Sequence, residues 1–409
     1  MNTTNKIKLS SMMFLEFFIW GAWFVTLGTF LGTNLKASGA ETAAVFSTQS
    51  WGAIIAPFII GLIADRYFNA ERILGVLHLV GAFLMYQMYQ SSDLSSFYIY
   101  VFSYMVLYMP TLALVNSVAF NQMKDPEKEF SSIRVWGTIG WIVAGLSISY
   151  VFHWDSVESL ASGMLKNTFL LAGIAALVLG LLSFTLPATP PKVSDEKIKI
   201  GDIIGLDALK LLKDKNFAVF FISSILICIP LAFYYQNANP FLTESGLENP
   251  TGKMAIGQIS EALFLLLIPV FFSKYGFKKT ILVGMVAWAL RYALFAYGNG
   301  GELSFMLIIG IALHGICYDF FFVSGQIYTN SKAGDKYKSA AQGLITLATY
   351  GVGMLIGFAV AGWITDNYKT ATGTINWEMV WIIPAGIALA VFVLFALTFN
   401  DKNKTEVSH

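Results

Sequence analysis

The chain has 409 residues, of which 56% are hydrophobic and only 12% are charged. Soluble domains carry about 25% charged residues, so this composition excludes an ordinary soluble protein. The formal net charge of +1 argues against a nucleic-acid partner. The sequence therefore predicts an all-α integral membrane protein that is surrounded by lipid.

Apolar stretches close to the roughly 20 residues that cross a bilayer recur along the whole chain. The first is too long for the apolar core of a cleavable signal peptide, so we interpret it as a membrane helix. We predict twelve transmembrane helices, over residues 9–32, 44–64, 73–91, 96–120, 133–153, 167–187, 216–240, 254–273, 279–298, 303–327, 339–364 and 379–399.

One long polar interruption, over residues 187–215, divides these helices into two sets of six. Its second part, IGDIIGLDALKLLKD, has apolar residues at helical spacing, which predicts an amphipathic helix along the membrane surface. We expect an N-terminal six-helix bundle over 1–187 and a cytoplasmic central loop over 188–215. A C-terminal six-helix bundle over 216–400 and a cytoplasmic tail over 401–409 follow.

Lysine and arginine residues indicate the orientation of a membrane protein. If the N-terminus is cytoplasmic, the cytoplasmic segments hold 20 of the 26 Lys and Arg residues, and the outer loops hold four. Arg134 and Arg291 fall within predicted helices or at their edges. We therefore expect both termini in the cytoplasm.

The two halves of the chain contain similar segments. GLIADRYFNAERILG follows the second predicted helix, and FFSKYGFKKTILVG follows the eighth, about 210 residues later. SSIRVWG opens the fifth helix, and SAAQG opens the eleventh, 208 residues later. Internal repeats are typical of secondary transporters, whose substrate site lies near the membrane midplane between the halves.

Two carboxylates lie deep within apolar stretches, Glu261 in the eighth predicted helix and Asp319 in the tenth. A charged side chain at the centre of a membrane helix costs about 2.5–3.5 kcal/mol on insertion scales. Such residues usually face the interior of a helix bundle and mark an ion or substrate path. The pair predicts a transporter that handles protons.

The segment GLIADR resembles the loop signature G-x-L-x-D-R of the major facilitator superfamily. Gly61, Asp65 and Arg66 match this signature, whereas the basic residues that usually follow are altered. The resemblance implies that Asp65 and Arg66 form a latch between the cytoplasmic ends of neighbouring helices. An ordinary charged turn is the alternative interpretation.

Eight stretches in collinear order carry a closer resemblance, which covers nearly the whole chain: FIWGAWFVTLGTF, YMPTLALVNS, IRVWGTIGW, GLDALKLLKDKNFAVFF, QISEALF, WALRYALFAYG, GICYDFF and SAAQG. They resemble the bacterial nucleoside:H+ symporter family. The resemblance implies the major facilitator fold and proton-driven import of purine or pyrimidine nucleosides across the bacterial cytoplasmic (inner) membrane. It implies nucleoside, H+ and lipid as partners and no cofactor besides the coupling proton, and we expect a monomer.

In the fifth predicted helix, Arg134, Thr138 and Trp141 have the spacing i, i+4, i+7 and share one helix face. Arg and Thr can bond the polar groups of a nucleoside, and Trp can stack on its base. The resemblance implies substrate contact by Arg, Thr and Phe at these positions, with Trp141 in place of Phe. Alternatively, Arg134 extends to the cytoplasmic surface.

In the eighth helix, Gln258 and Glu261 lie three residues apart on one face. The resemblance implies that both contact substrate. A carboxylate accepts hydrogen bonds from two ribose hydroxyls, and an amide can bond a base edge. A polar pair that only ties helices together is the alternative.

In the tenth helix, the candidates are His314, Tyr318 and Asp319. The resemblance implies Tyr, Phe and Asp in contact with substrate here, so only Asp319 matches fully. Histidine titrates near neutrality, and His314 could therefore alter the pH dependence of transport. A packing role for His314 is the alternative.

The seventh helix departs most from the family. The substrate-contacting Gln and Asn of the family fall on Ala232 and Tyr235. Pro230 and Pro240 predict a kink that could bring other polar side chains inward. The candidates for substrate contact in this segment are Tyr235, Gln236, Asn237 and Asn239.

The first helix contains Glu16, Trp20, Trp23 and Thr26. One or both tryptophans are candidates for the pocket wall, with aromatic packing as the alternative. Glu16 is a candidate for a second proton site. Arg291, in the ninth helix, is interpreted as structural, with an intramembrane acid or a backbone carbonyl as its partner.

These residues lead to a hypothesis for coupling, in which Asp319 approaches Arg134 between the halves. Proton arrival at Asp319 would release Arg134 to bind substrate, or substrate would compete for Arg134. Either route links the two binding events. We expect Asp319 to carry the proton first, and Glu261 second.

Three other functions are alternatives to nucleoside import. A facilitator-superfamily permease for a sugar, or a drug exporter, would share the fold. An intramembrane enzyme is not expected, because the sequence has no HExxH, no GxSxG and no Cys/His metal-ligand spacing. For a sensor built on a transporter fold, the central loop is too short to hold a signalling domain.

Cys228 and Cys317 are expected to be packing residues rather than a disulfide.

Overall fold

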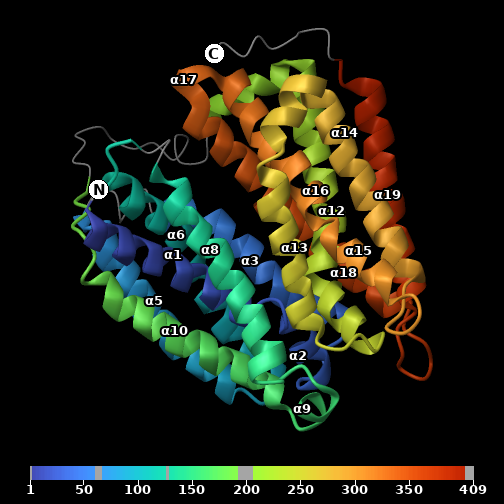
Figure 1. The fold of residues 1–409 in the computed structure, drawn as a ribbon. Coiled ribbons are helices and arrows are strands. Elements are labelled where there is room, and N and C mark those ends of the chain that lie inside the picture. Colours follow the sequence, from blue (N-terminus) through green and yellow to red (C-terminus); the bar gives the residue numbers. More distant parts are fainter. Residues whose placement is uncertain (1, 60–66, 126–128, 192–205, 401–409) are drawn as a thin grey trace. The chain divides into compact units, whose positions relative to one another are not determined.

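The computed structural model describes residues 2–59, 67–125, 129–191 and 206–400. These ranges are almost entirely helical and contain no β-strand beyond one isolated bridge between Lys369 and Ile375. The chain forms two compact units (Figure 1). Unit 1 comprises Met1–Ile198 and Glu248–Ala255, and unit 2 comprises Lys199–Leu247 and Ile256–His409. The predicted all-α fold is therefore confirmed for the described residues.

Unit 1 is built from long helices that pack in pairs. The most extensive pairs are α1 with α8, α5 with α10 and α3 with α6. In chain order the helices are α1 (Thr3–Trp23), α2 (Leu27–Thr33), α3 (Gly39–Ile59), α5 (Ala70–Gln90), α6 (Leu94–Asn121), α8 (Ser131–Leu146), η2 (Ser147–Val151), α9 (Val157–Ala161), η3 (Met164–Lys166) and α10 (Asn167–Ser183).

Glycines bring α1 and α8 into close contact. A Cβ atom at Gly140 would lie 2.2 Å from the carbonyl oxygen of Phe14, and one at Gly137 would lie 2.6 Å from the Phe17 ring. Small residues allow membrane helices to approach closely enough for their backbones to touch. This crossing places α8, which carries Arg134, directly against α1.

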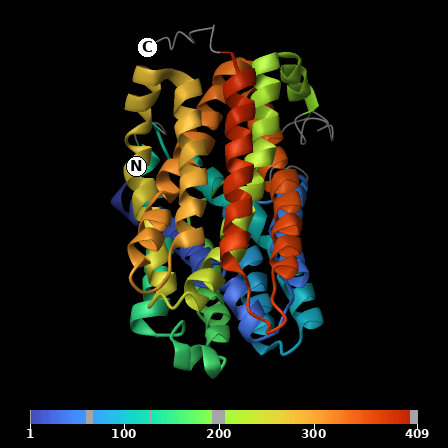
Figure 2. The ribbon, with the colours of Figure 1, turned by 90° about the vertical axis from the view of Figure 1, so that its right-hand side faces the viewer.

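In unit 2, α12 packs against both α18 and α19, and α14 packs against α19. Figure 2 shows the red helix α19 alongside the yellow-green α12. The elements are η4 (Leu206–Lys213), α12 (Lys215–Glu244), α13 (Pro250–Leu265, which begins in unit 1), α14 (Ile268–Tyr297), α15 (Ser304–Ala312), α16 (His314–Tyr318), η5 (Asp319–Val323), α17 (Ser324–Thr346), η6 (Leu347–Gly353), α18 (Met354–Asn367) and α19 (Trp377–Thr398).

Two of the helices, α14 and α17, each extend over parts of two predicted membrane helices, and a glycine inside each one marks the break. Gly276, inside α14, has φ 75°, and Gly334, inside α17, has φ 63°. These left-handed conformations favour glycine because it has no Cβ atom. The break at Gly276 falls between the predicted helices 254–273 and 279–298. The break at Gly334 falls between 303–327 and 339–364.

Nine helices in the described part of the chain are long and apolar enough to cross a membrane. The predicted multi-spanning character is thus confirmed. Three predicted helices are not among the nine. Residues 60–66 of the helix predicted over 44–64 lie outside the described ranges, as do the predicted latch residues Gly61, Asp65 and Arg66. The helix predicted over 133–153 is α8 continued by the π-helical turn η2, and the one over 254–273 is divided between α13 and α14.

The described end of the central loop packs against protein. Ala208, in η4, is fully buried against Ala333, Ala341 and Leu344 of α17. We predicted a helix along the membrane surface for this segment. Residues 206–213 form the 3-10 helix η4, whose described apolar contact is with α17. Its position along the membrane surface stays a prediction.

Asp214 caps the N-terminus of α12. Its Oδ1 atom accepts a hydrogen bond of 2.9 Å from the Phe217 N–H, and its Oδ2 atom lies 3.0 Å from Nζ of Lys332. Partial burial opposes ionisation, but these two donors outweigh it and hold the pKa of Asp214 below its usual range. The capped, charged N-terminus fixes the start of the long helix on which the candidates of the seventh predicted helix lie.

Candidate functional site

Arg134, Thr138 and Trp141 lie on the single helix α8, so the predicted common face exists in unit 1. All three side chains are half-buried. The guanidinium carbon of Arg134 lies 4.2 Å above the ring of Phe17, on α1. This cation–π contact holds Arg134 against the neighbouring helix.

The two tryptophans of α1 have different surroundings. Trp20 is half-buried and meets Trp141 edge to face, with ring centroids 5.6 Å apart. Trp23 is fully buried and packs edge to face on Tyr104, at 5.6 Å. Trp20 thus lies beside the candidate face of α8, whereas Trp23 belongs to the core of unit 1.

The two predicted acids of unit 2 lie on different elements. Glu261, on α13, is half-buried like its neighbour Gln258. Asp319 begins the π-helical turn η5 and is 1% exposed. Its Oδ2 atom has no hydrogen-bond partner within the described ranges. Single π-helical turns within α-helices are frequent at functional sites.

His314 connects Glu261 to a buried arginine. The Nε2 atom of His314 lies 3.8 Å from Oε2 of Glu261, and its Nδ1 atom lies 3.0 Å from Nη1 of Arg291. Arginine only donates hydrogen bonds, so Nδ1 is the acceptor and the single ring proton is on Nε2. The imidazole is therefore neutral while this contact lasts. An effect of His314 on the pH dependence of transport stays a prediction.

Arg291 is fully buried on α14. Its guanidinium carbon lies 3.5 Å above the ring of Tyr234, which also stacks on His314 with centroids 5.2 Å apart. We predicted an acid or a backbone carbonyl as the partner of Arg291, and this was wrong. The partners that the structure shows are an imidazole nitrogen and an aromatic face, which accommodate a planar cation without a second charge.

The candidates on the seventh predicted helix lie on a continuous α12, which runs from Lys215 to Glu244 through both prolines. The helix is therefore not unwound here. Gln236 is buried, and neither amide atom has a hydrogen-bond partner in the described part of the chain. Asn237 donates to Oγ1 of Thr365 on α18 at 3.1 Å. Tyr235 is half-buried and Asn239 is buried.

Ala232, where the resemblance implies a polar contact, packs against α18. This side chain is fully buried, and its Cβ lies 2.6 Å from the position that a Cβ of Gly357 would occupy. The candidate polar side chains of α12 lie at neighbouring positions.

Sequence reasoning missed several residues around these candidates. Tyr350, in η6, forms a short hydroxyl–hydroxyl hydrogen bond with Tyr318. Tyr234 was not singled out, although it contacts both Arg291 and His314. In unit 1, His78 lies beside Glu16. The sequence signal for these residues was a tyrosine hydroxyl or a lone histidine within an apolar segment. Their contact partners lie far away in sequence, so the pattern could not show which residues they meet.

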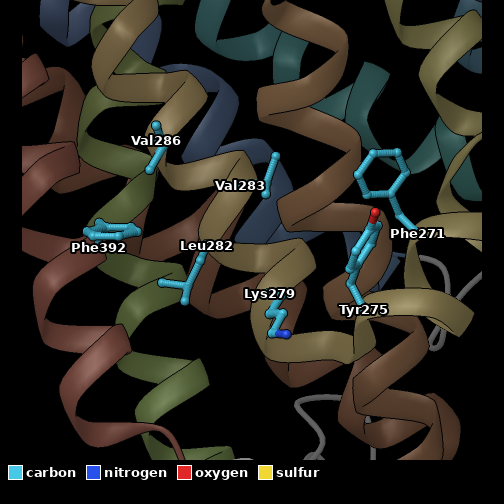
Figure 3. Close-up of a pocket in the computed structure, with 7 residues that line it drawn as sticks. All are labelled: Phe271, Tyr275, Lys279, Leu282, Val283, Val286 and Phe392. Atoms are coloured by element: carbon cyan, nitrogen blue, oxygen red, sulfur yellow. The ribbon is translucent and has the colours of Figure 1, made fainter.

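Two cavities lie elsewhere in the units. One in unit 2, of about 480 Å³, is lined by Phe271, Tyr275, Lys279, Leu282, Val283, Val286 and Phe392 (Figure 3). One in unit 1, of about 610 Å³, is lined by Lys6, Ile7, Ser10, Ser11, Phe14, Leu15 and Trp136. Neither contains a predicted site residue. Their mostly apolar walls suit an acyl chain better than a polar nucleoside.

The structure thus assembles the predicted residues into two groups, one in each unit. Unit 1 presents Arg134, Thr138 and Trp141 on one helix face. Unit 2 joins Glu261 to Arg291 through His314, with Asp319 nearby. Buried charged groups on long apolar helices are typical of membrane transporters, where they mark ion and substrate paths.

Comparison with known proteins agrees with this class. The model of the family "Nucleoside H+ symporter" matches residues 1–404. The putative nucleoside transporter YegT of Escherichia coli (strain K12) is 43% identical, over 98% of this chain and 95% of that protein. The nucleoside permease NupG of the same organism is 32% identical, over 97% and 96%. A crystal structure of the nucleoside transporter NupG superposes with a TM-score of 0.86 at 31% identity, over 98% of this chain and 100% of that chain.

The chain therefore belongs to the nucleoside H+ symporter family. The resemblance inferred from the eight sequence stretches is confirmed over the full range of the match. The membership identifies the chain as a multi-spanning transporter of a bacterial permease family.

Proposed function

We propose that this chain imports purine or pyrimidine nucleosides into the bacterial cell together with protons, by alternating access. The observation that carries the proposal is the pair of acids in unit 2, Glu261 and Asp319. Glu261 lies beside His314, which contacts the buried Arg291, and one carboxylate oxygen of Asp319 has no hydrogen-bond partner in the part of the chain that the structure describes. The family membership supports the same substrates.

The proposed architecture has twelve transmembrane helices in two six-helix bundles of the major facilitator type, over 1–187 and 216–400. A central loop over 188–215 joins them, and the tail over 401–409 and the N-terminus are cytoplasmic. The excess of Lys and Arg in the predicted inner segments supports this orientation. We place the protein in the inner membrane as a monomer, with Gly61, Asp65 and Arg66 as the conformational latch.

The proposed substrate contacts are given for each unit by itself. Trp141 stacks on the base, while Arg134 and Thr138 bond polar groups of the substrate. The neutral His314 presents its Nε2–H toward Glu261, which keeps that carboxylate positioned to accept ribose hydroxyls. The other proposed contacts are Tyr235, Gln236, Asn239, Gln258, Tyr318 and Asp319.

In the proposed coupling step, Asp319 carries the proton, with Glu261 as the second candidate. A buried carboxylate oxygen without a hydrogen-bond partner is costly when charged, which favours proton binding. Ionised Asp319 would attract Arg134, and protonated Asp319 would leave Arg134 to the substrate. The proton and the nucleoside then favour each other's binding, as symport requires.

The test is uptake of radiolabelled uridine and adenosine into proteoliposomes that contain the purified protein. We expect uptake that an inward proton gradient stimulates and that unlabelled nucleosides, but not sugars, compete away. Uptake that sugars inhibit and nucleosides do not would contradict the proposed substrate. Nucleoside uptake that ignores the gradient would contradict the proposed coupling.

A further inference from the structure

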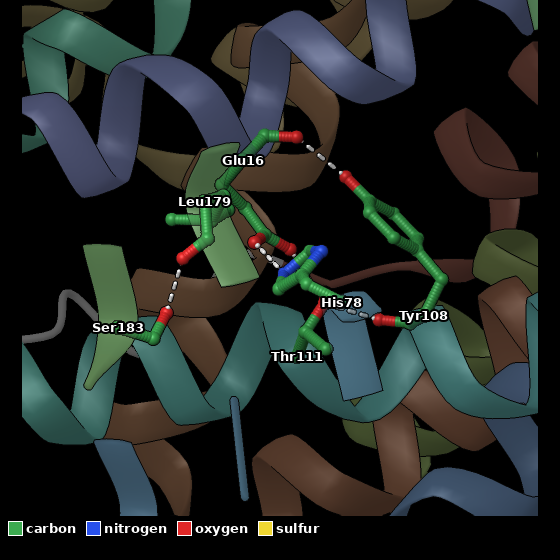
Figure 4. Close-up of polar contacts among 6 residues, drawn as sticks. All are labelled: Glu16, His78, Tyr108, Thr111, Leu179 and Ser183. Atoms are coloured by element: carbon green, nitrogen blue, oxygen red, sulfur yellow. Dashed lines mark hydrogen bonds and ion pairs between the residues drawn. The ribbon is translucent and has the colours of Figure 1, made fainter. Parts of the chain in front are cut away.

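A second group of titratable side chains lies inside unit 1. Glu16 on α1 is fully buried, and its Oε2 atom lies 2.8 Å from Nε2 of His78 on α5. Its Oε1 atom lies 2.5 Å from Oγ1 of Thr111 on α6. His78 and Thr111 are 2% and 1% exposed, so little water reaches the group. Figure 4 shows the Glu16 carboxylate next to the His78 ring, with Thr111 and Tyr108 close by.

The hydrogen bonds of Thr111 limit where protons can be. Its hydroxyl lies within hydrogen-bond distance of Glu16 Oε1 and also of the Tyr108 carbonyl oxygen, at 2.6 Å. A hydroxyl has one hydrogen and donates only once. If Glu16 is protonated on Oε1, it donates to Thr111, which donates to Tyr108. Oε2 then accepts from His78 Nε2–H, and every contact is satisfied.

The electrostatics of the pair favour one bound proton. An uncompensated charge in a dry interior costs several kcal/mol. A protonated Glu16 with neutral His78, and an ionised Glu16 with protonated His78, both have no net charge and contain the same number of protons. Loss of that proton leaves one negative charge, and gain of another leaves one positive charge. The neutral state with one shared proton is therefore the stable state of the closed bundle.

We infer that Glu16 and His78 form a proton-binding site in unit 1 that holds one exchangeable proton between them. The proton leaves when water reaches the pair and can stabilise the charge that remains. The site is additional to the Asp319 and Glu261 acids of the proposed function. Proton binding at this pair does not depend on what the protein transports.

The other ionisable groups near the pair are few. From α6, the hydroxyl of Tyr108 donates to the backbone carbonyl of Glu16 at 2.8 Å, and Tyr104 stacks on Tyr108. From α8, Arg134 lies over Phe17, the residue after Glu16. On α1 itself, the nearest charged residue in sequence is Lys8, which bonds the carbonyl of Thr185.

The helix α10 contributes no titratable side chain, since its sequence is NTFLLAGIAALVLGLLS. Its Ser183 bonds the carbonyl of Leu179 within α10 (Figure 4). On α5, Glu71 accepts from the backbone N–H of Thr189, so it is engaged elsewhere. Arg134 is thus the cationic residue of α8, the helix that packs against α1, on which Glu16 lies.

The test counts protons that the purified protein takes up in an acid–base titration. We compare the unchanged protein with Glu16→Gln, His78→Gln and the double variant. An isolated carboxyl in an apolar interior keeps its proton, and an isolated imidazole stays neutral. Each single variant should therefore lose about one proton from the titration, and the double variant should lose no more than that. Glu302→Gln, at an exposed position, calibrates the loss of one titrating group.

Two results would overturn the inference. Single variants that titrate like the unchanged protein would mean that the pair is a permanent structural contact. A double variant that loses two protons would mean two independent groups. If the glutamine variants aggregate, Thr111→Val keeps both titrating groups, and it must keep the proton count while shifting the midpoint. The unchanged protein could fail to transport nucleosides while the single variants still titrate one proton fewer than it does. That result would support the Glu16–His78 site and contradict only the proposed function.

Discussion

Replacing Asp319 by asparagine is expected to abolish proton-driven accumulation of nucleoside while leaving nucleoside exchange. Asparagine keeps the size and polarity of the side chain but cannot take up and release a proton. Coupling free energies of about 1–3 kcal/mol correspond to roughly 5- to 150-fold changes in affinity. We therefore expect the stimulation of uridine uptake by the gradient to fall at least about fivefold. Uptake with a gradient, and exchange against internal uridine without one, are measured on the same proteoliposomes.

Glu302→Gln is the matched control, because it removes an exposed acid outside the proposed site. It should accumulate uridine as the unchanged protein does. If Asp319→Asn also accumulates uridine normally, Asp319 is not the proton carrier. If it loses exchange as well as accumulation, the Asp319 carboxylate is required for the substrate contact itself, and the loss of accumulation cannot be assigned to coupling.

Replacing Glu261 by glutamine is expected to weaken uridine binding by roughly 10- to 100-fold. Hydrogen bonds to a charged group contribute about 1.5–3 kcal/mol, and an amide oxygen is a weaker acceptor than a carboxylate. The 3.8 Å separation from His314 Nε2 also means that the imidazole loses an anionic neighbour. Calorimetry with purified protein measures the dissociation constant directly.

A substrate analogue assigns the effect to the ribose. The unchanged protein should bind 2′,3′-dideoxyuridine much more weakly than uridine, because the analogue lacks both ring hydroxyls. In Glu261→Gln this difference should become much smaller, which is the signature of an interaction between the two changed groups. An undiminished difference would show that Glu261 does not contact the ribose hydroxyls.

Local pattern was sufficient to predict the groups that lie on one helix. Arg134, Thr138 and Trp141 share a face because α8 is continuous, as their spacing indicated. Glu261 and Asp319 were identified because a carboxylate within an apolar helix is costly and rarely incidental. These inferences require only the helical period and the apolar character of the bilayer interior.

Partners across helices could not be predicted in the same way. Arg291 meets His314 23 residues along the chain, and Glu16 meets His78 after 62 residues. Such pairs depend on how the helices cross. The crossings depend in part on glycines, and the helical period of the sequence does not predict which glycines lie at a crossing. For this reason Arg291 was given the wrong partner, and His78 was not singled out.

The breaks at Gly276 and Gly334 show another limit. Both glycines adopt positive φ between predicted membrane helices. The bounds of α14 and α17 therefore differ from the predicted helix bounds. The seventh predicted helix is a further case. α12 runs through both prolines, so this segment is not unwound, whereas the kink that the prolines suggested stays a prediction. Packing against neighbouring helices stabilises a helix that propensity alone would interrupt.

The central claim is that nucleoside and proton cross the membrane together. The most direct measurement places a pH-sensitive dye inside proteoliposomes with no initial proton gradient and adds uridine outside. The account predicts internal acidification that follows uridine entry and that a proton ionophore abolishes. Uridine entry without any change in internal pH would contradict it.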